Sequence, residues 1–500
     1  MGIESKGGRQ MKMMGETSRQ RILFALLCCC CVCVPFLLVT FPPITDLPQH
    51  VAQVSLFQDA VSNPDSPYRI QWMTPYSLVY AVLGLSCGII GPELAGSLGM
   101  VILAFMWIGM VHWLAAKRAR PSQGAVLVTV LFFSHILYWG FYQFILGWIV
   151  FLGWVLLTQT QRARLVQEFF LFFIGGILLY MAHVLWFFVA MGWLVGGDVL
   201  FRRQWKTIFV RLAATLPVCA CVLVWYPSLA AYGFGSKTLW VSSPLQRFSF
   251  TWLVDSALGG LKGSMEYVVV GVILVWIGLS LFQYRRDIRR RLDVELLVLG
   301  AGFFVMGFVL PDKHTNTIQF AQRWIPPAVC LIVLSLPPLR LKKWIGQFAA
   351  AVVVAGFMLT TSLSWLMFES SGYSGLQECL KKLPENPRVI GLSYIQRSPY
   401  VKGKPFIQGF AYSQVYKGGA LNFSFADFGP SLVVYQKKRQ LSWTSGLEWF
   451  PETAKLNDFT YFDYALINGS DELHARLTDI DLLKPVTHEG RWRLYKTSVE

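Results

Sequence analysis

The sequence predicts a mainly α-helical, polytopic membrane protein with about eleven transmembrane helices and a small C-terminal α/β domain outside the membrane. Of its 500 residues, 54% are hydrophobic and only 14% are charged, which is unusual for a soluble domain. Apolar runs long enough to span a bilayer recur throughout residues 22–368. Residues 369–500 differ, because charges of both signs nearly balance there and short β-like runs alternate with helix-like ones.

The first apolar run extends from Ile22 to Phe41 and contains no charged residue. About 20 residues, each rising 1.5 Å, span the roughly 30 Å hydrocarbon core, so we expect one helix to cross here. A cleaved signal peptide is the alternative, but its apolar segment would be shorter, and no small-x-small cleavage site follows. We therefore expect residues 1–21 to remain as a basic cytoplasmic tail.

The remaining runs that we expect to cross lie at 93–116, 124–139, 142–160, 169–183, 184–200, 207–227, 267–284, 294–311, 324–339 and 346–368. Residues 75–90 are also apolar, but if they crossed, the basic cluster KRAR would lie opposite RAR, FRRQWK, YRRDIRRR and RLKK. Basic loops gather on the cytoplasmic side. We therefore predict a re-entrant or surface-lying helix at 75–90, inside a first outer loop, 42–92. The net charge of +16 is then explained by basic loops that orient the helices in the membrane, and we expect no nucleic-acid partner.

The C-terminal segment, 369–500, is predicted to be an extracytoplasmic α/β domain. Its β-like runs are RVIGLSY, SLVVYQ, YALING and RWRLYK, and its helix-like runs are GLQECLKKL and DELHARL. An inside N-terminus and an odd number of crossings place it outside. It contains one cysteine, Cys379, so no internal disulfide holds it.

The stretch DLPQH directly after the first crossing supplies the candidate catalytic residues, Asp46 and His50. Asp46 can cap a helix that begins at Leu47, with Gln49 completing a capping box, and this is the structural alternative. Because Asp46 and His50 are four residues apart, both could also face one outward pocket near the lipid headgroups. There an acid can act as a general base, and an imidazole can orient it or bind phosphate.

Other unusual polar residues gather on the same predicted side. They are Tyr142, Gln143, His183, Asp312, Lys313, His314 and Arg323. For His183 the alternative is a hydrogen-bonded histidine packed between helices. For Asp312, Lys313 and His314 it is a solvated loop.

Arg323 lies at the threshold of a crossing, where burial toward the bilayer centre would cost roughly 2.5–3.5 kcal/mol unless the charge is paired. A guanidinium at headgroup depth can hold a lipid phosphate with paired hydrogen bonds. Simple lipid anchoring is the alternative.

Several classes of function are disfavoured by what the sequence lacks. Hardly any charge lies within the predicted crossings, so the proton relays and ion sites of a coupled transporter are missing. The sequence contains no Walker loop, no GxGxxG after a strand, and no metal-spaced Cys/His cluster. We predict no cofactor, although a divalent metal is not excluded.

The whole arrangement resembles the GT-C superfamily of polytopic glycosyltransferases, which use polyprenyl-phosphate sugars. More narrowly, DLPQH, GFYQFILG, YMAH and QRW resemble elements of a bacterial group of membrane proteins with DLPNH, GFxNFxLG, a Leu-Ser-His-like element and an Arg-Phe pair. Gln143 stands where that pattern has Asn, and Trp324 where it has Phe. The first loop also lacks the adjacent acidic pair of several GT-C families.

The resemblance implies a hexosyl or pentosyl transfer from a polyprenyl phosphate to an acceptor hydroxyl on the outer face of a bacterial inner membrane. In that setting Asp46, with His50 beside it, is the catalytic base or the acceptor-binding carboxylate of an inverting transfer. Arg323, Lys313, His314 and His183 bind the donor phosphate, while Tyr142, Gln143 and Asp312 line the cleft. The expected partners are the lipid-linked sugar, a glycan or lipid acceptor, and membrane lipids. The alternative is a non-enzymatic lipid-linked oligosaccharide transporter or an envelope assembly scaffold.

Overall fold

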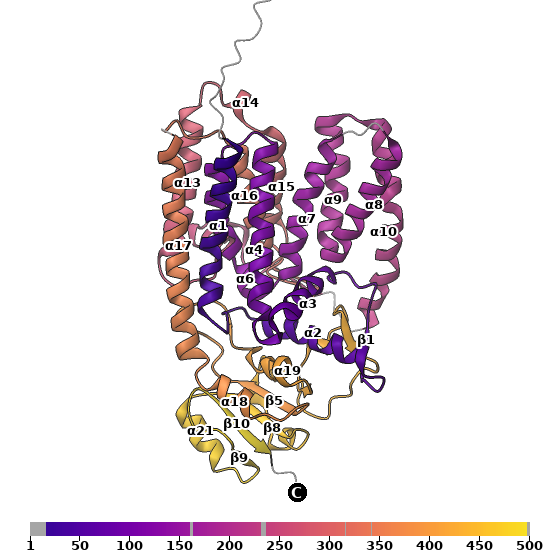
Figure 1. Cartoon of the computed structure of the whole chain (residues 1–500), viewed down its shortest axis with the longest axis vertical. Helices are drawn as coiled ribbons and strands as arrows, with labels where there is room; N and C mark the ends of the chain where they lie inside the picture. The colour runs from indigo at the N-terminus through magenta and orange to yellow at the C-terminus, as the bar shows by residue number, and fades with distance from the viewer. Residues whose placement is uncertain (1–16, 161–163, 232–236, 316, 342, 498–500) are drawn as a thin grey trace, which may run out of the picture.

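The computed structural model describes residues 17–497, with breaks at 161–163, 232–236, 316 and 342. The predicted basic tail, 1–21, lies outside the described residues except for its last five. The predicted fold class is confirmed, because a bundle of long apolar helices carries a small domain of strands and short helices at one end (Figure 1).

Nine helical segments of the described chain are long and apolar enough to cross a membrane: α1 (Ser18–Leu38), α4 (Pro92–Lys117), the succession of α5 (Ser122–Leu127), η1 (Val128–Phe133) and α6 (His135–Trp139), α7 (Tyr142–Gln159), α8 (Leu165–Ala182), α9 (Val184–Gly197) with its extension η2 (Asp198–Arg202), α10 (Trp205–Ala231), α13 (Met265–Gln283) and α17 (Lys343–Gly372). Each coincides with a predicted run.

The two remaining predicted runs form shorter helices that pack against each other, α15 (Val294–Val309) and α16 (Ile325–Ser335). At 1.5 Å per residue, α16 is only about 16 Å long. It ends before Pro337 and Pro338, which cannot continue the hydrogen-bond ladder. These two segments are therefore helical as expected but shorter than a full crossing.

The segment 75–90 forms α3 (Leu78–Ile90), a helix of 13 residues. Gly91, with φ of 80°, lies between it and α4, and the two helices pack together. Its length of about 20 Å is less than the hydrocarbon core, and it lies beside α2 (Leu47–Ser62) at one end of the bundle (Figure 1). Both features agree with a re-entrant or surface-lying helix.

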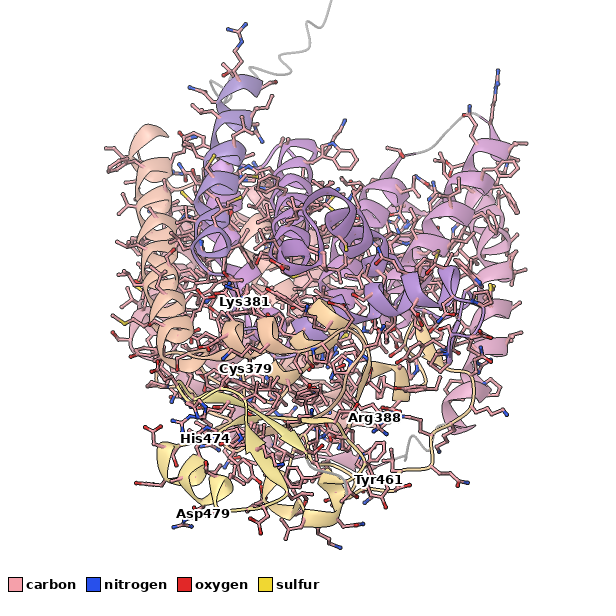
Figure 2. All side chains as sticks on the ribbon, turned by 60° about the horizontal axis from the view of Figure 1, so that its bottom comes forward. Cys379, Lys381, Arg388, Tyr461, His474 and Asp479 are labelled. Atoms are coloured by element: carbon pink, nitrogen blue, oxygen red, sulfur yellow. The ribbon has the colours of Figure 1, made fainter. Side chains whose placement is uncertain are left out.

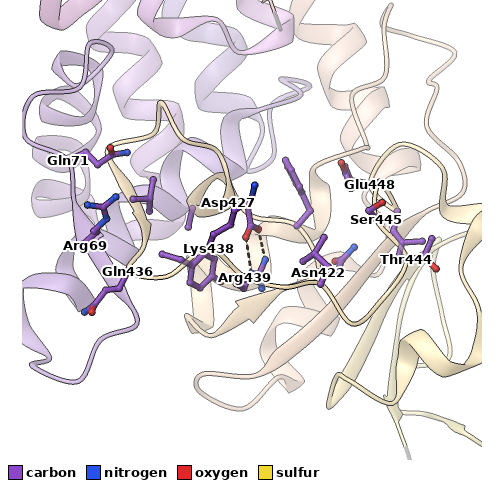
Figure 3. Close-up of a pocket in the computed structure, with 17 residues that line it drawn as sticks. Arg69, Gln71, Asn422, Asp427, Gln436, Lys438, Arg439, Thr444, Ser445 and Glu448 are labelled. Carbon is purple, nitrogen blue, oxygen red and sulfur yellow. Dashed lines mark hydrogen bonds and ion pairs between the residues drawn. The ribbon is translucent and has the colours of Figure 1, made fainter. Parts of the chain in front are cut away.

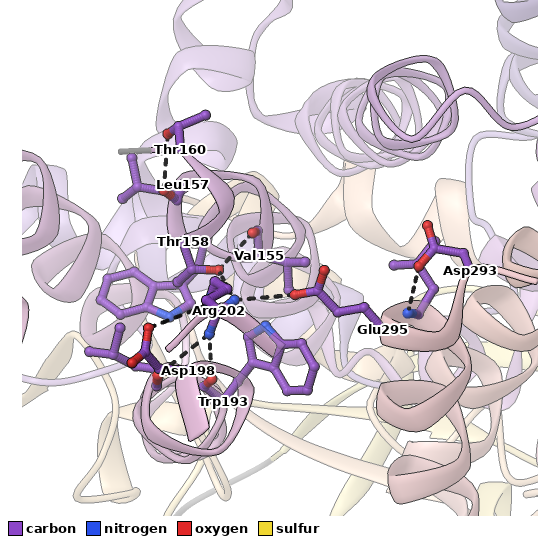
Figure 4. A network of polar contacts seen from close by, with 12 residues as sticks. Val155, Leu157, Thr158, Thr160, Trp193, Asp198, Arg202, Asp293 and Glu295 are labelled. Atoms are coloured by element: carbon purple, nitrogen blue, oxygen red, sulfur yellow. Dashed lines mark hydrogen bonds and ion pairs between the residues drawn. The ribbon is translucent and has the colours of Figure 1, made fainter. Parts of the chain in front are cut away.

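The two ends of the bundle differ in charge and architecture. The C-terminal domain and α2 lie at one end, whereas the basic α14 (Ile288–Arg291) lies at the other (Figure 1). Near α14, Arg118 donates to Asp293 across 2.6 Å. Arg202 donates to Glu295 across 3.2 Å, a contact that Figure 4 shows. This network ties the ends of α4 and η2 to the start of α15.

The C-terminal domain is built on a mixed five-stranded sheet in the order β6-β5-β8-β10-β9. Its elements are α18 (Leu376–Lys382), β5 (Arg388–Ser393), η4 (Gly409–Ala411), α19 (Tyr412–Lys417), β6 (Ala420–Leu421), η5 (Phe425–Asp427), β7 (Val433–Tyr435), η6 (Pro451–Thr453), α20 (Leu456–Phe459), β8 (Tyr464–Asn468), α21 (Asp471–Thr478), β9 (Leu483–Pro485) and β10 (Trp492–Thr497). β5 runs parallel to β6 and β8, while β10 runs antiparallel to β8 and β9. The predicted strand and helix runs all appear.

One predicted strand has a different partner from the others. β7 is not part of the five-stranded sheet, and it pairs antiparallel with β1 (Tyr68–Ile70) of the first loop. The first loop is therefore attached to the C-terminal domain through a two-stranded ribbon. A second small sheet contains β2 (Thr238–Leu239), β3 (Lys313–His314) and β4 (Thr317–Ile318), and the short helices α11 (Pro244–Arg247) and α12 (Phe250–Ala257) follow β2.

The reactive side chains inside the C-terminal domain have structural roles (Figure 2). His474 Nδ1 is 2.9 Å from the Tyr495 hydroxyl, and its Nε2 is 3.0 Å from the Arg491 carbonyl oxygen. The Cys379 thiol lies 3.3 Å from the carbonyl oxygen of Trp492. Both His474 and Cys379 are fully buried, so neither faces a ligand.

Candidate functional site

Asp46 lies at the N-cap position of α2, where the chain leaves α1 and meets the turn between α6 and α7. The Thr45 amide donates to the carbonyl oxygen of Tyr138 across 2.9 Å. Gly140 has a φ of +89°, and a Cβ placed there would lie 2.8 Å from the Cβ of Asp46. Glycine is thus required for both the turn and the close approach of Asp46.

The capping alternative for Asp46 is not realised, because its side chain makes no capping hydrogen bond. Gln49, the expected partner in a capping box, turns instead toward the C-terminal domain. Its amide nitrogen donates to Gln408 across 2.9 Å, and its oxygen accepts from the Phe425 amide across 3.0 Å. The Asp46 carboxylate is therefore not committed to holding the helix end.

Arg323 belongs to η3 (Gln322–Trp324), directly before α16, and is 6% exposed. Its Nε and Nη2 donate to the carbonyl oxygen of Ile318 across 3.1 and 2.9 Å. Its guanidinium carbon stands 3.6 Å from the ring centroid of Phe141, in cation–π geometry. No described residue accepts a hydrogen bond from Nη1, so this group can still donate to a ligand.

Asp46 and Arg323 influence each other electrostatically. Burial raises the pKa of Asp46 to about 7, and the charge of Arg323 opposes that rise. Burial lowers the pKa of Arg323 to about 9, and Tyr76 and Asp46 oppose that fall. Near neutral pH the site therefore holds a guanidinium cation and a carboxyl group that can exchange a proton. The two side chains form no direct ion pair.

Tyr76 joins this group, although nothing in the sequence distinguishes it. Its φ of 75° is left-handed, which is a genuine outlier for a bulky residue and is typical of functional sites. Its ring centroid lies 4.9 Å from that of His183 and 6.1 Å from that of Trp225. The only hint in the sequence is the preceding proline, Pro75, which restricts the local backbone.

His50 is buried in a polar cluster one turn along α2 from Asp46. Its Nδ1 lies 3.0 Å from the Tyr80 hydroxyl and 3.4 Å from the Gln143 amide nitrogen. Burial lowers the pKa of His50 to about 3, so the imidazole is neutral, and a backbone hydrogen bond with Gly140 opposes the shift. Because its partners include Gln143 and the backbone of Gly140, His50 is suited to position the 140–143 turn. Tyr142 packs its ring 5.2 Å from His50, and its buried hydroxyl has no partner among the described residues.

His183 satisfies the packing alternative and also lies near the Arg323 charge. The Leu185 amide donates to its Nδ1 across 3.2 Å, which caps α9. Burial, followed by the charge of Arg323, lowers the pKa of His183, so its imidazole is neutral. Because Nδ1 accepts, the proton is on Nε2. His183 can offer a neutral donor but not the positive charge that a phosphate-binding cation would supply.

Asp312, Lys313 and His314 are not brought to Asp46 by any contact among the described residues. Asp312 is buried and receives 2.9 Å hydrogen bonds from Arg247 and Gln322, so it links two outer loops rather than lining a cleft. Lys313 and His314 form β3, and His314 Nδ1 is 3.0 Å from the Thr238 hydroxyl. Backbone pairing in the small sheet, which the sequence did not reveal, sets Lys313 opposite Ile318, and the role of Lys313 and His314 in binding phosphate stays a prediction.

The described residues were also considered as ligands for a metal ion. Among them, no group of three or more His, Cys, Asp or Glu side chains is placed to hold a metal ion. The candidate site consists of the guanidinium of Arg323, the carboxyl group of Asp46 and the aromatic residues around them.

Comparisons with known proteins identify the fold. Two crystal structures of ArnT from Cupriavidus metallidurans are similar to this chain at 13% identity. The apo structure has a TM-score of 0.55 over 95% of this chain and 97% of that one. The structure bound to undecaprenyl phosphate has a TM-score of 0.56 over 96% and 98%. Because ArnT is a GT-C glycosyltransferase, the chain has a GT-C-like fold. No family model and no curated protein sequence matches the chain.

Proposed function

We propose that the protein is a membrane glycosyltransferase. It transfers a sugar from a polyprenyl phosphate to an acceptor hydroxyl at the end of the bundle that carries the C-terminal domain. The observation that carries the proposal is the arrangement of Asp46 and Arg323. An acid with a raised pKa, not used as a cap, shares a partly buried site with a guanidinium that keeps a free donor. The GT-C-like fold and the undecaprenyl phosphate bound by ArnT supply the donor class.

The proposed reaction is a single displacement with inversion. The Asp46 carboxylate takes the proton of the acceptor hydroxyl as its oxygen bonds to the anomeric carbon. The bond between that carbon and the phosphate oxygen breaks at the same time, and polyprenyl phosphate leaves with the electron pair. The proton then passes from Asp46 to solvent, which regenerates the carboxylate.

Arg323 is the group suited to the negative charge that develops on the leaving phosphate. It is held against Phe141 and Ile318, so little reorganisation is needed when the charge appears. The Nε2–H of His183 and the hydroxyl of Tyr76 are further donors at the same site. His50 acts as a positioning residue, because it links α2 to the turn that contains Gly140.

The orientation follows from the basic residues at the opposite end. Clusters such as the one in α14 lie away from the C-terminal domain (Figure 1), and basic loops face the cytoplasm. We therefore place Asp46 and the C-terminal domain on the outer face of a bacterial inner membrane.

The decisive experiment compares wild type with the Asp46→Asn variant in lipid nanodiscs. Each is offered a mixture of polyprenyl-phosphate sugars with envelope glycans as acceptors, and mass spectrometry follows the release of free polyprenyl phosphate. We expect wild type to release it and Asp46→Asn to be slower by at least about 10²-fold, since a general base contributes 10²–10⁴-fold.

The matched control is Asp65→Asn, which removes an exposed carboxylate from the same loop. It should retain wild-type activity. Equal release by the Asp46→Asn variant and wild type would remove Asp46 from the chemistry. Absence of release from every donor and acceptor would favour a transporter or a scaffold.

A further inference from the structure

A cavity of about 750 Å³ lies between the first loop and the C-terminal domain, apart from the residues around Asp46 (Figure 3). We call it the outer pocket. Its walls are the β1–β7 ribbon, the chain around Asn422 and the loop 436–448. Its volume falls within the range of about 300–1,000 Å³ that is usual for small-molecule sites.

The outer pocket has an excess of positive charge. Arg69, Lys438 and Arg439 line it, against two carboxylates, Asp427 and Glu448. Arg439 Nε donates to Asp427 across 2.8 Å, so these two charges neutralise each other. Lys438 is exposed and makes no ion pair within the described chain. An anionic group would therefore be attracted to the side of the pocket that Lys438 lines.

Glu448 is the second feature that points to a ligand. It is 8% exposed and lines the pocket, yet its carboxylate makes no hydrogen bond or ion pair with another described residue (Figure 3). Its only hydrogen bond is to its own backbone amide, which leaves most of the acceptor sites of the carboxylate open. Burial raises the pKa of Glu448, as expected for a carboxyl that lacks a cation. Ligand hydroxyl groups would supply the missing donors.

The remaining lining suits a sugar ring. Ser445 and Thr444 add hydroxyl groups beside Glu448, and Gly446, with φ of +81°, makes the turn that brings them together. The Tyr435 ring also lines the pocket, but the Arg439 guanidinium stacks on it at 4.4 Å from the ring centroid, and the Tyr68 ring centroid lies 4.8 Å away. The two hydroxyl groups, the carboxylate of Glu448 and the cation of Lys438 together suit a saccharide that carries a negative charge.

We propose that the outer pocket binds an anionic saccharide, a sugar unit bearing a phosphate or carboxylate, and thereby holds the acceptor. The claim that the pocket holds the acceptor rests on the proposed function. The pocket is linked to the candidate active site by α2, because Gln49 and Gln53 bond to Phe423 and Val433 behind the pocket wall. A ligand in the outer pocket therefore contacts the same chain segment that positions the helix of Asp46.

The binding test uses the full-length protein in nanodiscs and three probes: glucose 6-phosphate, glucose and inorganic phosphate. Titration by ligand-observed NMR gives each Kd. We expect glucose 6-phosphate to bind more tightly than either of the others. The Lys438→Gln variant should bind it about tenfold more weakly, the effect of one charged hydrogen bond. Glu448→Gln should reduce the preference for glucose 6-phosphate over inorganic phosphate.

The matched control is Lys437→Gln, since Lys437 is an exposed neighbour that does not line the pocket. It should leave all three Kd values unchanged. Equal loss in the two lysine variants would reduce the effect to general surface charge and overturn the proposal. Equal binding of phosphate and glucose 6-phosphate, or no binding of any probe, would also overturn it.

The acceptor clause has its own readout, the rate of polyprenyl-phosphate release with an anionic and a neutral glycan acceptor. Lys438→Gln should raise KM for the anionic acceptor alone and leave kcat unchanged. Unchanged KM would show that the pocket serves a free sugar phosphate and would overturn the acceptor clause only. Probe binding without release from any donor would overturn the proposed function and retain the pocket.

Discussion

At the scale of single residues, Asp46 gives the site a dependence on pH. Its pKa of about 7 means that the carboxylate fraction rises as the pH is raised through neutrality. We expect kcat/KM to rise roughly tenfold per pH unit below about pH 6 and to level off above about pH 8. A pH profile of polyprenyl-phosphate release measures this. A flat profile between pH 5.5 and 8 would contradict Asp46 as the base.

The same raised pKa has a consequence for stability. Asp46 binds its proton more tightly in the folded protein than in the unfolded chain, where the ordinary value is 3.8. The stabilising effect of that proton is complete below about pH 4 and is lost as the pH rises through 7. Compared with wild type, Asp46→Asn should therefore gain a few degrees in Tm between pH 5 and pH 8. Thermal unfolding in nanodiscs tests this, and an equal difference in Tm at both pH values would count against it.

Arg323 can be tested with a substitution that keeps its charge. Lysine cannot reproduce the planar stacking on Phe141 or the paired hydrogen bonds to Ile318. We expect Arg323→Lys to reduce kcat/KM by about 10- to 100-fold, corresponding to one charge-assisted hydrogen bond. The Lys262→Arg variant, at an exposed outer position, should be unaffected.

Residues of the site differ in how well the sequence alone could reveal them. Asp46 and Arg323 could be named as candidates from the sequence, since each is a charge close to an apolar run, and their roles stay predictions. Tyr76 could not, because only the backbone angles distinguish it from other tyrosines. Asp312 looked like a cleft residue because its partner Arg247 is distant in sequence, and their ion pair forms only in the folded chain.

At the scale of elements, α2 is the helix whose placement matters most. Gln53, fully buried, donates to the Val433 carbonyl across 3.1 Å and accepts from the Val433 amide across 2.8 Å. Gln53→Leu leaves both backbone groups unsatisfied, at about 1–3 kcal/mol each. We expect a lower Tm and faster proteolysis of the C-terminal domain. Gln58→Leu, on the exposed side of α2, should change neither.

The turn between α6 and α7 provides a second test. Gly140→Ala introduces a Cβ where φ is +89° and Asp46 is only 2.8 Å away. It should therefore reduce both activity and Tm, with a cost of at least about 1 kcal/mol from the backbone conformation. Gly109→Ala, in the middle of α4 with nothing within 4 Å, is the control and should be neutral or slightly stabilising. Equal effects of the two changes would remove the special role of Gly140.

The helical elements were predictable from apolar runs because each run forms its hydrogen bonds locally. The strands of the C-terminal domain were predictable as segments, but their partners were not. The pairing of β7 with β1 joins residues more than 360 positions apart, and no local pattern encodes it. The small sheet that holds Lys313 and His314 was missed for the same reason.

At the scale of the whole molecule, the two ends of the bundle can be told apart by protease. Trypsin should cut the exposed Lys437–Lys438 bond only from the outer face, and the exposed Arg289–Arg290 bond only from the cytoplasmic face. Sealed vesicles of known sidedness, followed by mass spectrometry of the fragments, measure this. Cleavage of both bonds from one side would refute the proposed orientation.

The hydrogen bonds between α2 and the C-terminal domain also determine when, during synthesis of the chain, the surroundings of Asp46 can form. Gln49 and Gln53 reach partners that are synthesised about 360 to 380 residues later. During translation the segment with Asp46 is therefore synthesised early, and it lacks these hydrogen bonds until almost the whole chain has been made. A nascent or truncated chain would consequently lack a formed site, and activity would begin only when synthesis is nearly complete.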